Sequence, residues 1–155
     1  MARSSETPED MPGVRGEDGR GRTAEALRLT LPVAPSSNNA WANRKIGRGF
    51  GRIKTRAHKE WIIQADRWMV YQKLTPRIHA ITVPYQCTMV FPSNLRSDLD
   101  GRSKVILDWL VSRQLTIDDK HLRKLILEHD DTLVGSSEAG TALVQIEVIP
   151  WGLSR

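Results

Sequence analysis

Two pairs of aspartates on either side of a short amphipathic segment constrain this chain more than any other feature. Asp98 and Asp100 stand one residue apart, and Asp118 and Asp119 are adjacent. The segment between them carries one apolar stripe, which predicts a helix over residues 102–113. A turn after this helix would carry the second pair back toward the first. We therefore expect a strand end, a helix and a return loop to gather carboxylates at one place.

Carboxylates gathered in this way would form a site for a hard cation. An Asp-x-Asp in extended backbone directs both side chains to the same side. Asp100 is also a candidate N-cap of the helix, since its oxygen can accept an unpaired backbone N–H. Asp100, Lys104 and Asp108 follow at intervals of four and form a row along the helix. Three converging carboxylates beside a lysine predict an oxygen-rich site for Mg²⁺ or Mn²⁺.

Each aspartate pair also has a purely structural interpretation. An aspartate before a helix is commonly a cap, and a pair of aspartates after a helix is commonly a solvated turn. The specific signal is the combination: Asp-x-Asp, a lysine four residues later, and Asp-Asp after one helix.

Three segments together match the pattern of a known family. They are L-P-V-A-P-S-S-N-N-A-W at residues 31–41, D-L-D-G-R-S-K at residues 98–104, and D-D at residues 118–119. In these motifs and their order over about residues 27–150, the chain resembles the RusA family of Holliday-junction resolvases. These are endonucleases that cut four-way DNA junctions. One position departs from the family pattern, because Gly101 stands where the family usually has Asn.

The resemblance implies an activity and a set of catalytic residues. The activity is that of a Mg²⁺-dependent endodeoxyribonuclease, which resolves four-way junctions by paired symmetric nicks in DNA recombination and repair. Asp98, Asp100 and Asp119 would hold one or two Mg²⁺ (or Mn²⁺) ions. Lys104 would orient the attacking water or stabilise the charge at phosphorus. The family works as a homodimer, which agrees with the approximate two-fold symmetry of a four-way junction.

Three further residues are expected to have accessory roles. By resemblance, the loop that contains Asn38 lies near the active site, although its Ser-Ser-Asn-Asn sequence also fits an ordinary turn. Asp118 adjoins the expected ligand Asp119. Asp108 stands four residues after Lys104, so it could instead be the partner that holds this lysine in place.

The most basic stretch of the chain, residues 44–56, predicts a DNA contact. Its glycines permit close approach of the backbone, and its cations can neutralise phosphates. Phe50 could stack on an unpaired base or wedge into a junction. The alternative is a solvated hairpin tip. The residues expected to bind DNA are Arg44, Lys45, Arg48, Arg52 and Lys54.

The remaining pattern predicts an α+β fold, with a mixed, largely antiparallel sheet of about five strands and two packed helices. The better defined helix covers residues 55–72, with Thr55 as its N-cap and with Trp61 and Trp68 on the core face. The extended segments alternate apolar and polar residues. They are expected at residues 27–31, 81–83, 85–91, 122–128 and 141–149.

The composition bounds the domain organisation. Residues 1–26 hold almost no large apolar side chain, which predicts a disordered tail or a start codon placed too far upstream. Residues 27–150 form the endonuclease-like domain, and residues 151–155 are a frayed end. The net charge is +5, and the tail holds more acids than arginines. The domain is therefore more basic than the whole chain, as suits a polyanionic partner.

The sequence also indicates a compartment. Cys87 is the single cysteine, so no disulfide can form within the chain, which fits a reducing environment. No apolar run is long enough to span a membrane, and the N-terminus lacks the apolar core of a signal peptide. We expect a cytoplasmic protein. The four histidines lack the spacing of zinc ligands.

Two other functions fit the same features. The first is a structure-selective protein that binds branched DNA without cutting it. The second is a different two-metal phosphoesterase that acts on RNA or on flaps.

Overall fold

A computed structural model describes residues 26–73, 80–95, 98–133 and 142–152 of the chain. Most of the expected tail and the last three residues lie outside this part. In chain order the elements are β1 (Leu27–Pro32), α2 (Ser37–Ala40), β2 (Trp41–Ile46), β3 (Gly49–Lys54), α3 (Arg56–Lys73), β4 (Tyr85–Pro92), α4 (Leu99–Ser112), the 3₁₀ turn η1 (Asp119–His121), β5 (Leu122–Asp130), the 3₁₀ turn η2 (Asp131–Leu133) and β6 (Leu143–Pro150). The fold is α+β, as predicted.

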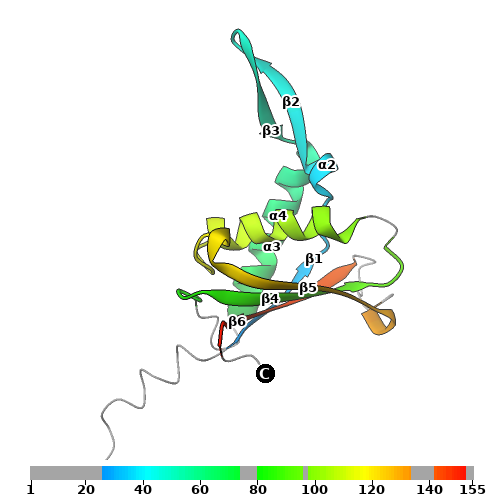
Figure 1. Ribbon diagram of the computed structural model, residues 1–155. Coiled ribbons are helices and arrows are strands. Elements are labelled where there is room, and N and C mark those ends of the chain that lie inside the picture. The colour runs from blue at the N-terminus through cyan, green and yellow to red at the C-terminus, as the bar shows by residue number, and fades with distance from the viewer. Residues whose placement is uncertain (1–25, 74–79, 96–97, 134–141, 153–155) are drawn as a thin grey trace, which may run out of the picture.

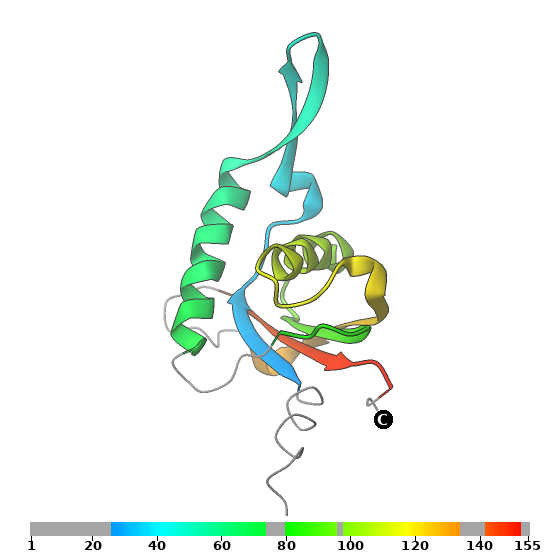
Figure 2. The same cartoon turned by 90° about the vertical axis from the view of Figure 1, so that its left-hand side faces the viewer.

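Four strands form the main sheet, in the order β1-β6-β4-β5. β6 pairs antiparallel with both β1 and β4, whereas β4 and β5 are parallel. The sheet is thus mixed and largely antiparallel. α4 lies across one of its faces and α3 stands beside it (Figures 1 and 2). The main sheet has four strands where about five were expected, and β2 and β3, which were not among those five segments, form a separate two-stranded sheet.

One expected strand is absent from the described residues. At residues 81–83 the structure has a single bridge, in which Ile81 pairs with Thr116. A bend follows at once, and Pro84 supplies no N–H with which to continue a ladder. The next segment, β4, is a strand as predicted.

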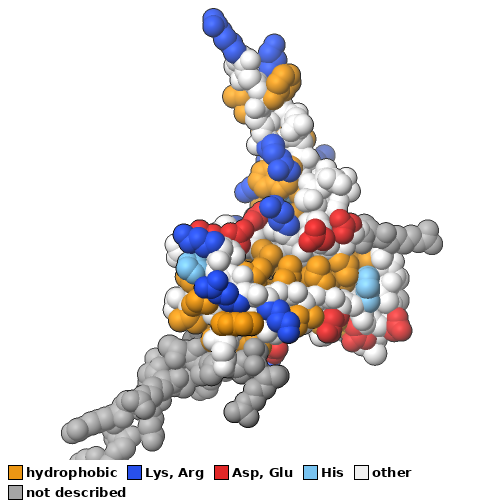
Figure 3. All heavy atoms as spheres, in the orientation of Figure 1, with side chains coloured by type: hydrophobic (Ala, Val, Ile, Leu, Met, Phe, Trp, Pro, Cys, Tyr) orange, Lys and Arg blue, Asp and Glu red, His pale blue; other side chains and the backbone are white. Residues whose placement is uncertain are grey.

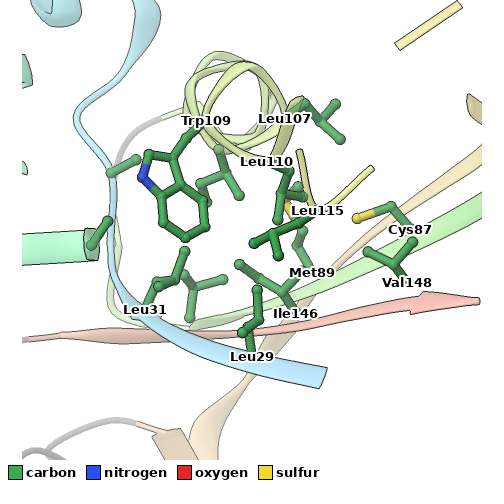
Figure 4. Close-up of a cluster of buried hydrophobic side chains, with 14 of the residues drawn as sticks. Leu29, Leu31, Cys87, Met89, Leu107, Trp109, Leu110, Leu115, Ile146 and Val148 are labelled. Carbon is green, nitrogen blue, oxygen red and sulfur yellow. The ribbon is translucent and has the colours of Figure 1, made fainter. Parts of the chain in front are cut away.

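The core lies between the main sheet and α4. On β4 the side chains of Cys87, Met89 and Phe91 are fully buried, as their alternation predicts. Figure 4 shows Trp109 and Leu110 of α4 directed toward the side chains of the sheet. Burying such side chains stabilises a fold by about 1.5–3 kcal/mol each. The predicted apolar stripe of α4 is entirely buried: Val105, Ile106, Trp109 and Leu110.

α3 begins where its sequence predicts. The Thr55 hydroxyl accepts a hydrogen bond from the backbone N–H of His58 at 3.2 Å, which caps the helix. Trp61 is a core residue, and its indole N–H donates to the carbonyl of Pro32 at 2.8 Å. At the other end, the Gln72 amide bonds the backbone N–H and C=O of Thr30, each at 2.7 Å. The bonds of Trp61 and Gln72 therefore attach both halves of α3 to β1.

A carboxylate joins the two long helices. Asp66 of α3 accepts two hydrogen bonds from the Arg113 guanidinium, at 2.6 and 2.7 Å. It also accepts one from the Trp109 indole, at 2.9 Å. The hydrogen bonds from Arg113 are the main reason that the pKa of Asp66 is lowered. This network joins the C-terminal end of α4 to the middle of α3.

The hairpin of β2 and β3 projects from the body of the molecule (Figures 1 and 2). Its six residue pairs run from Trp41 opposite Lys54 to Ile46 opposite Gly49. Gly47 has a φ of +60°, a conformation that glycine adopts at low cost in tight turns. None of the hairpin residues is buried. The hairpin therefore reaches into solvent, and it packs on the core through the partly buried Trp41 at its base.

The described helices include none with the length and apolar character needed to cross a membrane.

Candidate active site

The first aspartate motif forms the start of α4, one turn earlier than the sequence predicts. Asp98, not Asp100, is the N-cap, and its Oδ1 accepts the backbone N–H of Asp100 at 3.1 Å. Helical backbone begins at Leu99, so Asp100 belongs to the first turn and the motif is not extended. The prediction that Asp100 caps the helix was therefore wrong. Asp98 takes this place because either aspartate can cap, and the half-buried Leu99 packs on the core once the helix starts there.

The row along α4 is present and solvent-facing. Asp100, Lys104 and Asp108 are all exposed, at intervals of four on one helix face. The expected ion pair between Lys104 and Asp108 is not formed, since none of the salt bridges found among the described residues joins them. The lysine is thus an exposed cation between two exposed carboxylates. We call this row the acidic face of α4.

The second aspartate motif lies beside the acidic face. Asp118 caps the turn η1, and its Oδ2 lies 3.7 Å from the Lys120 ammonium. A hydrogen bond shared by the two carboxyl groups lowers the pKa of Asp118 and raises that of Asp119. The charges of Asp118 and Asp108 raise the pKa of Asp119 further, and Lys104 opposes them. The return loop therefore brings Asp119 into the field of residues in the middle of α4.

These carboxylates suit a hard divalent cation in their chemistry. Among the described residues, no three Asp, Glu, His or Cys side chains form a group that could by itself hold a metal ion. Mg²⁺ is usually bound by only one or two carboxylates, with waters and substrate phosphates completing its coordination. The Asp118–Asp119 pair matches that requirement, and its mutual repulsion is the kind that a cation relieves. Asp98 and Asp100 offer a second pair at the start of α4.

Gly101 brings the loop motif and the first aspartate motif together. A Cβ built on Gly101 would lie 3.1 Å from the Ser37 hydroxyl and 3.2 Å from the Ser37 nitrogen. The next residue, Arg102, donates a hydrogen bond to the carbonyl of Ala34. α2 is thereby held against α4, and the exposed Asn38 lies on α2 one residue beyond this contact. The loop is therefore part of the same surface as Asp98 and Asp100.

The hairpin has two chemically different faces, because residues paired across an antiparallel ladder point to the same side. One face carries cations and aromatic rings and is called here the basic face. Its pairs are Trp41 with Lys54, Asn43 with Arg52, and Lys45 with Phe50. The other face carries Arg44 among small and apolar residues. Arg48 stands in the turn. The five predicted DNA-binding cations are all exposed, but the structure divides them between two faces and the tip.

The base of the hairpin is anchored by a ring cluster that our sequence analysis did not identify. His58 is buried, and its ring meets the Trp41 ring edge-on, with centroids 5.1 Å apart. The Arg52 guanidinium lies 5.4 Å from the centroid of the same tryptophan. His58 has no ligand spacing in the sequence, and it is the third residue of α3, so the local pattern gave no signal for it. Its partner comes from another element and could not be recognised from local pattern.

Figure 3 shows how charge is distributed over these elements. Acidic side chains gather along the edge of the body at α4, and basic side chains line the hairpin that rises from it. A polyanion that contacts the hairpin would therefore meet carboxylates at its foot. Carboxylates repel phosphates, and a cation between them would reduce this repulsion.

No protein-family model matches this chain, and none of the curated proteins is significantly similar to it in sequence. The resemblance to RusA therefore stays a prediction.

Proposed function

We propose that this protein is a metal-dependent endonuclease of branched DNA that resembles the RusA resolvases. The observation that carries the proposal is the position of the carboxylates. One exposed aspartate pair and Lys104 lie on α4, a second exposed pair lies at η1 beside it, and a basic hairpin projects from the same part of the molecule. A site for a cation thus adjoins a surface for a polyanion.

The residues would share the work as follows. Asp118 and Asp119, with Asp98 and Asp100 at the start of α4, would hold one or two Mg²⁺ or Mn²⁺ ions. A bound divalent ion supplies Lewis-acid stabilisation of the phosphate and lowers the pKa of a water. Lys104 is exposed between the carboxylates, where its ammonium would donate to a phosphate oxygen and stabilise charge at phosphorus.

The hairpin would position the substrate. Lys45, Arg52 and Lys54 present three cations on one face, and Phe50 is 82% exposed on that face. Cations neutralise phosphates, and an exposed ring can stack on an unpaired base. A four-way junction has two equivalent strands to cut, so we propose that a homodimer makes paired nicks. The chain would act as a cytoplasmic enzyme of DNA recombination and repair.

A junction-cleavage assay tests this function. The wild-type chain and Asp98→Asn would be incubated with a labelled mobile four-way junction in Mg²⁺, Mn²⁺ or EDTA. Asp131→Asn is the matched control, since Asp131 is an exposed aspartate on η2. Symmetric nicks that need metal and Asp98 but not Asp131 are expected. Nicks that persist in EDTA, or in Asp98→Asn, would contradict the proposal.

A second candidate is a branched-DNA-binding protein without nuclease activity. It is favoured by one observation, that the described residues offer no ready group of three metal-binding side chains. It predicts tight junction binding that does not depend on metal, with no nick in any condition.

Competition among substrates separates the proposed activity from the phosphoesterase alternative. Junction, flap, duplex and RNA of equal length would compete for the labelled junction. A resolvase should prefer the junction, whereas preference for a flap or RNA would favour the other enzyme class.

A further inference from the structure

A pocket opens between the base of the hairpin and α4. It has a volume of about 210 Å³. At ~30 Å³ for each molecule in the liquid, this is room for roughly seven waters, well below the ~300–1,000 Å³ of sites for larger ligands. The lining residues come from β2, β3, α3 and α4: Trp41, Lys54, His58, Ile62, Asp108, Trp109 and Ser112. The space suits one flat ring system.

The lining is chemically suited to a nucleobase. Trp41, Ile62 and Trp109 supply an apolar wall, on which the face of a base can pack. At the rim, Lys54 donates hydrogen bonds and Asp108 accepts them. The Ser112 hydroxyl donates to the carbonyl of Trp109 at 2.8 Å and can accept a further bond. A base carries donors and acceptors on the edge of a ring, so these groups can pair with it once it leaves its stack.

His58 adds a fixed acceptor to this lining. Its Nδ1 lies 3.1 Å from the carbonyl of Ala40, which cannot donate, so Nδ1 carries the proton of this bond. Burial lowers the pKa of His58, which favours the neutral ring. Nε2 then has a lone pair, and in the described part of the chain no hydrogen bond uses it. The buried histidine thus has an unused acceptor in a residue that lines the pocket.

The pocket also lies on the path between the two parts of the proposed site. Trp41 and Lys54 form the last pair of the basic face, so a strand that follows this face from Phe50 arrives at the pocket. Asp108 lines the pocket and also raises the pKa of Asp119 by its charge. A nucleotide seated here would therefore carry its phosphate next to the carboxylates.

We propose that this pocket receives one unstacked nucleobase of the branched DNA, beside the phosphate to be cut. The inference rests on the proposed function and adds to it a binding site for a base. A base at the centre of a junction is less firmly stacked than one in a duplex, so its removal costs less. The pocket would thereby contribute to the choice of branched over linear DNA.

Photochemical cross-linking tests the pocket. Single 5-iododeoxyuridines would be placed around the branch of a four-way junction, bound by the full chain in EDTA so that the DNA stays intact. Cross-linked peptides would be identified by mass spectrometry. The test variant is Ser112→Phe, which fills the pocket from an exposed position. The control is Gln64→Phe, the same aromatic addition at an exposed site of α3 outside the pocket.

We expect a cross-link to Trp41 from one position at the branch in wild type and in Gln64→Phe. Ser112→Phe should lose it by about tenfold while its junction affinity changes by less than about threefold, since phosphate contacts dominate binding. If the cross-link to Trp41 persists in Ser112→Phe, or if cross-links form at Phe50 alone, the pocket does not bind a base. Either result would leave the nuclease proposal intact. If the wild type fails to bind the junction in preference to duplex, both proposals fall.

Discussion

The backbone nitrogen of Ser37 lies 3.2 Å from the point where any side chain on Gly101 would begin. The two residues belong to motifs that are 64 positions apart in the sequence, and their contact holds the loop of Asn38 against the helix of the aspartates. A Cβ on Gly101 would require Ser37 to move by a few tenths of an ångström, so glycine permits the close approach of the loop without that shift.

Gly101→Ala should therefore destabilise the protein. Alanine gains up to about 1 kcal/mol in helix propensity, but the contact with Ser37 costs about 1–3 kcal/mol if the backbone must move. We expect a net loss of up to about 2 kcal/mol in urea unfolding. Gln64→Ala, at an exposed site of α3, is a control for the effect of a helix substitution that makes no new contact. If Gly101→Ala is more stable than the wild type, the segment around Ser37 can move to accommodate the added methyl group at little cost.

Asp98 should have separable structural and functional roles. Asparagine caps a helix as well as aspartate does, whereas alanine costs about 1 kcal/mol. Asp98→Asn should thus retain wild-type stability, and Asp98→Ala should lose about 1 kcal/mol in thermal or urea unfolding. Both variants should lose metal-dependent cutting. Cutting by Asp98→Asn at the wild-type rate would assign this residue to the cap alone.

Asp119→Asn should abolish cutting without destabilising the fold. A carboxyl group whose pKa is raised in the folded state stabilises that state when protonated, and this stability is lost as pH rises through the folded pKa. At neutral pH the ionised Asp119 is repelled by Asp118 and Asp108, so removing its charge removes this repulsion from the folded state. The melting temperature at pH 7 should stay equal or rise. A clear fall would show that Asp119 makes a structural bond that the carboxyl pair does not explain.

Asp66 should make the fold sensitive to acid. Its pKa is lowered, so its contribution is present above the pKa of the unfolded chain and is lost as pH falls through the folded pKa. Asp66→Asn should cost about 1–2 kcal/mol at pH 7, a figure reduced for the partial exposure of the pair with Arg113. The cost should shrink as the pH falls through the folded pKa of Asp66, which lies below the ordinary value of an aspartate. Asp131→Asn, measured in parallel, should show neither effect.

The two faces of the hairpin should differ in their contribution to DNA binding. Replacing Lys45 and Arg52 with alanine should lower the slope of log affinity against log salt by about 2, since each phosphate contact contributes about 0.9. Arg44→Ala, on the opposite face, should change the slope by much less. Equal effects per residue on both faces would contradict a defined DNA-facing side.

The local patterns of the sequence predicted most of the fold. The periodicity of α3 around Trp61 and the alternation of β4 around Cys87 both correspond to buried faces. The predicted start of a helix was less accurate where two nearby residues could both act as its N-cap. Asp98 and Asp100 are chemically equivalent caps, so only packing of the following turn could choose between them.

The site could be predicted only in part, because several of its contacts join distant segments. The charges around Asp119 depend on how closely its loop returns to α4, and local pattern does not contain that distance. His58 and Asp66 were missed for the same reason. His58 contacts Trp41, and Asp66 bonds Arg113, and both partners lie on other elements. The division of the basic stretch into two faces needed the pairing register, which the sequence leaves open between several hairpin turns.

The hairpin of β2 and β3 packs on the core through Trp41 at its base, and its outer part, which has no buried residue, is a separable module. Its length, tip and charges can change without altering the packing that determines the stability of the main sheet. Selection, or an engineer, could therefore alter the reach and strength of the proposed DNA contact independently of the rest of the fold.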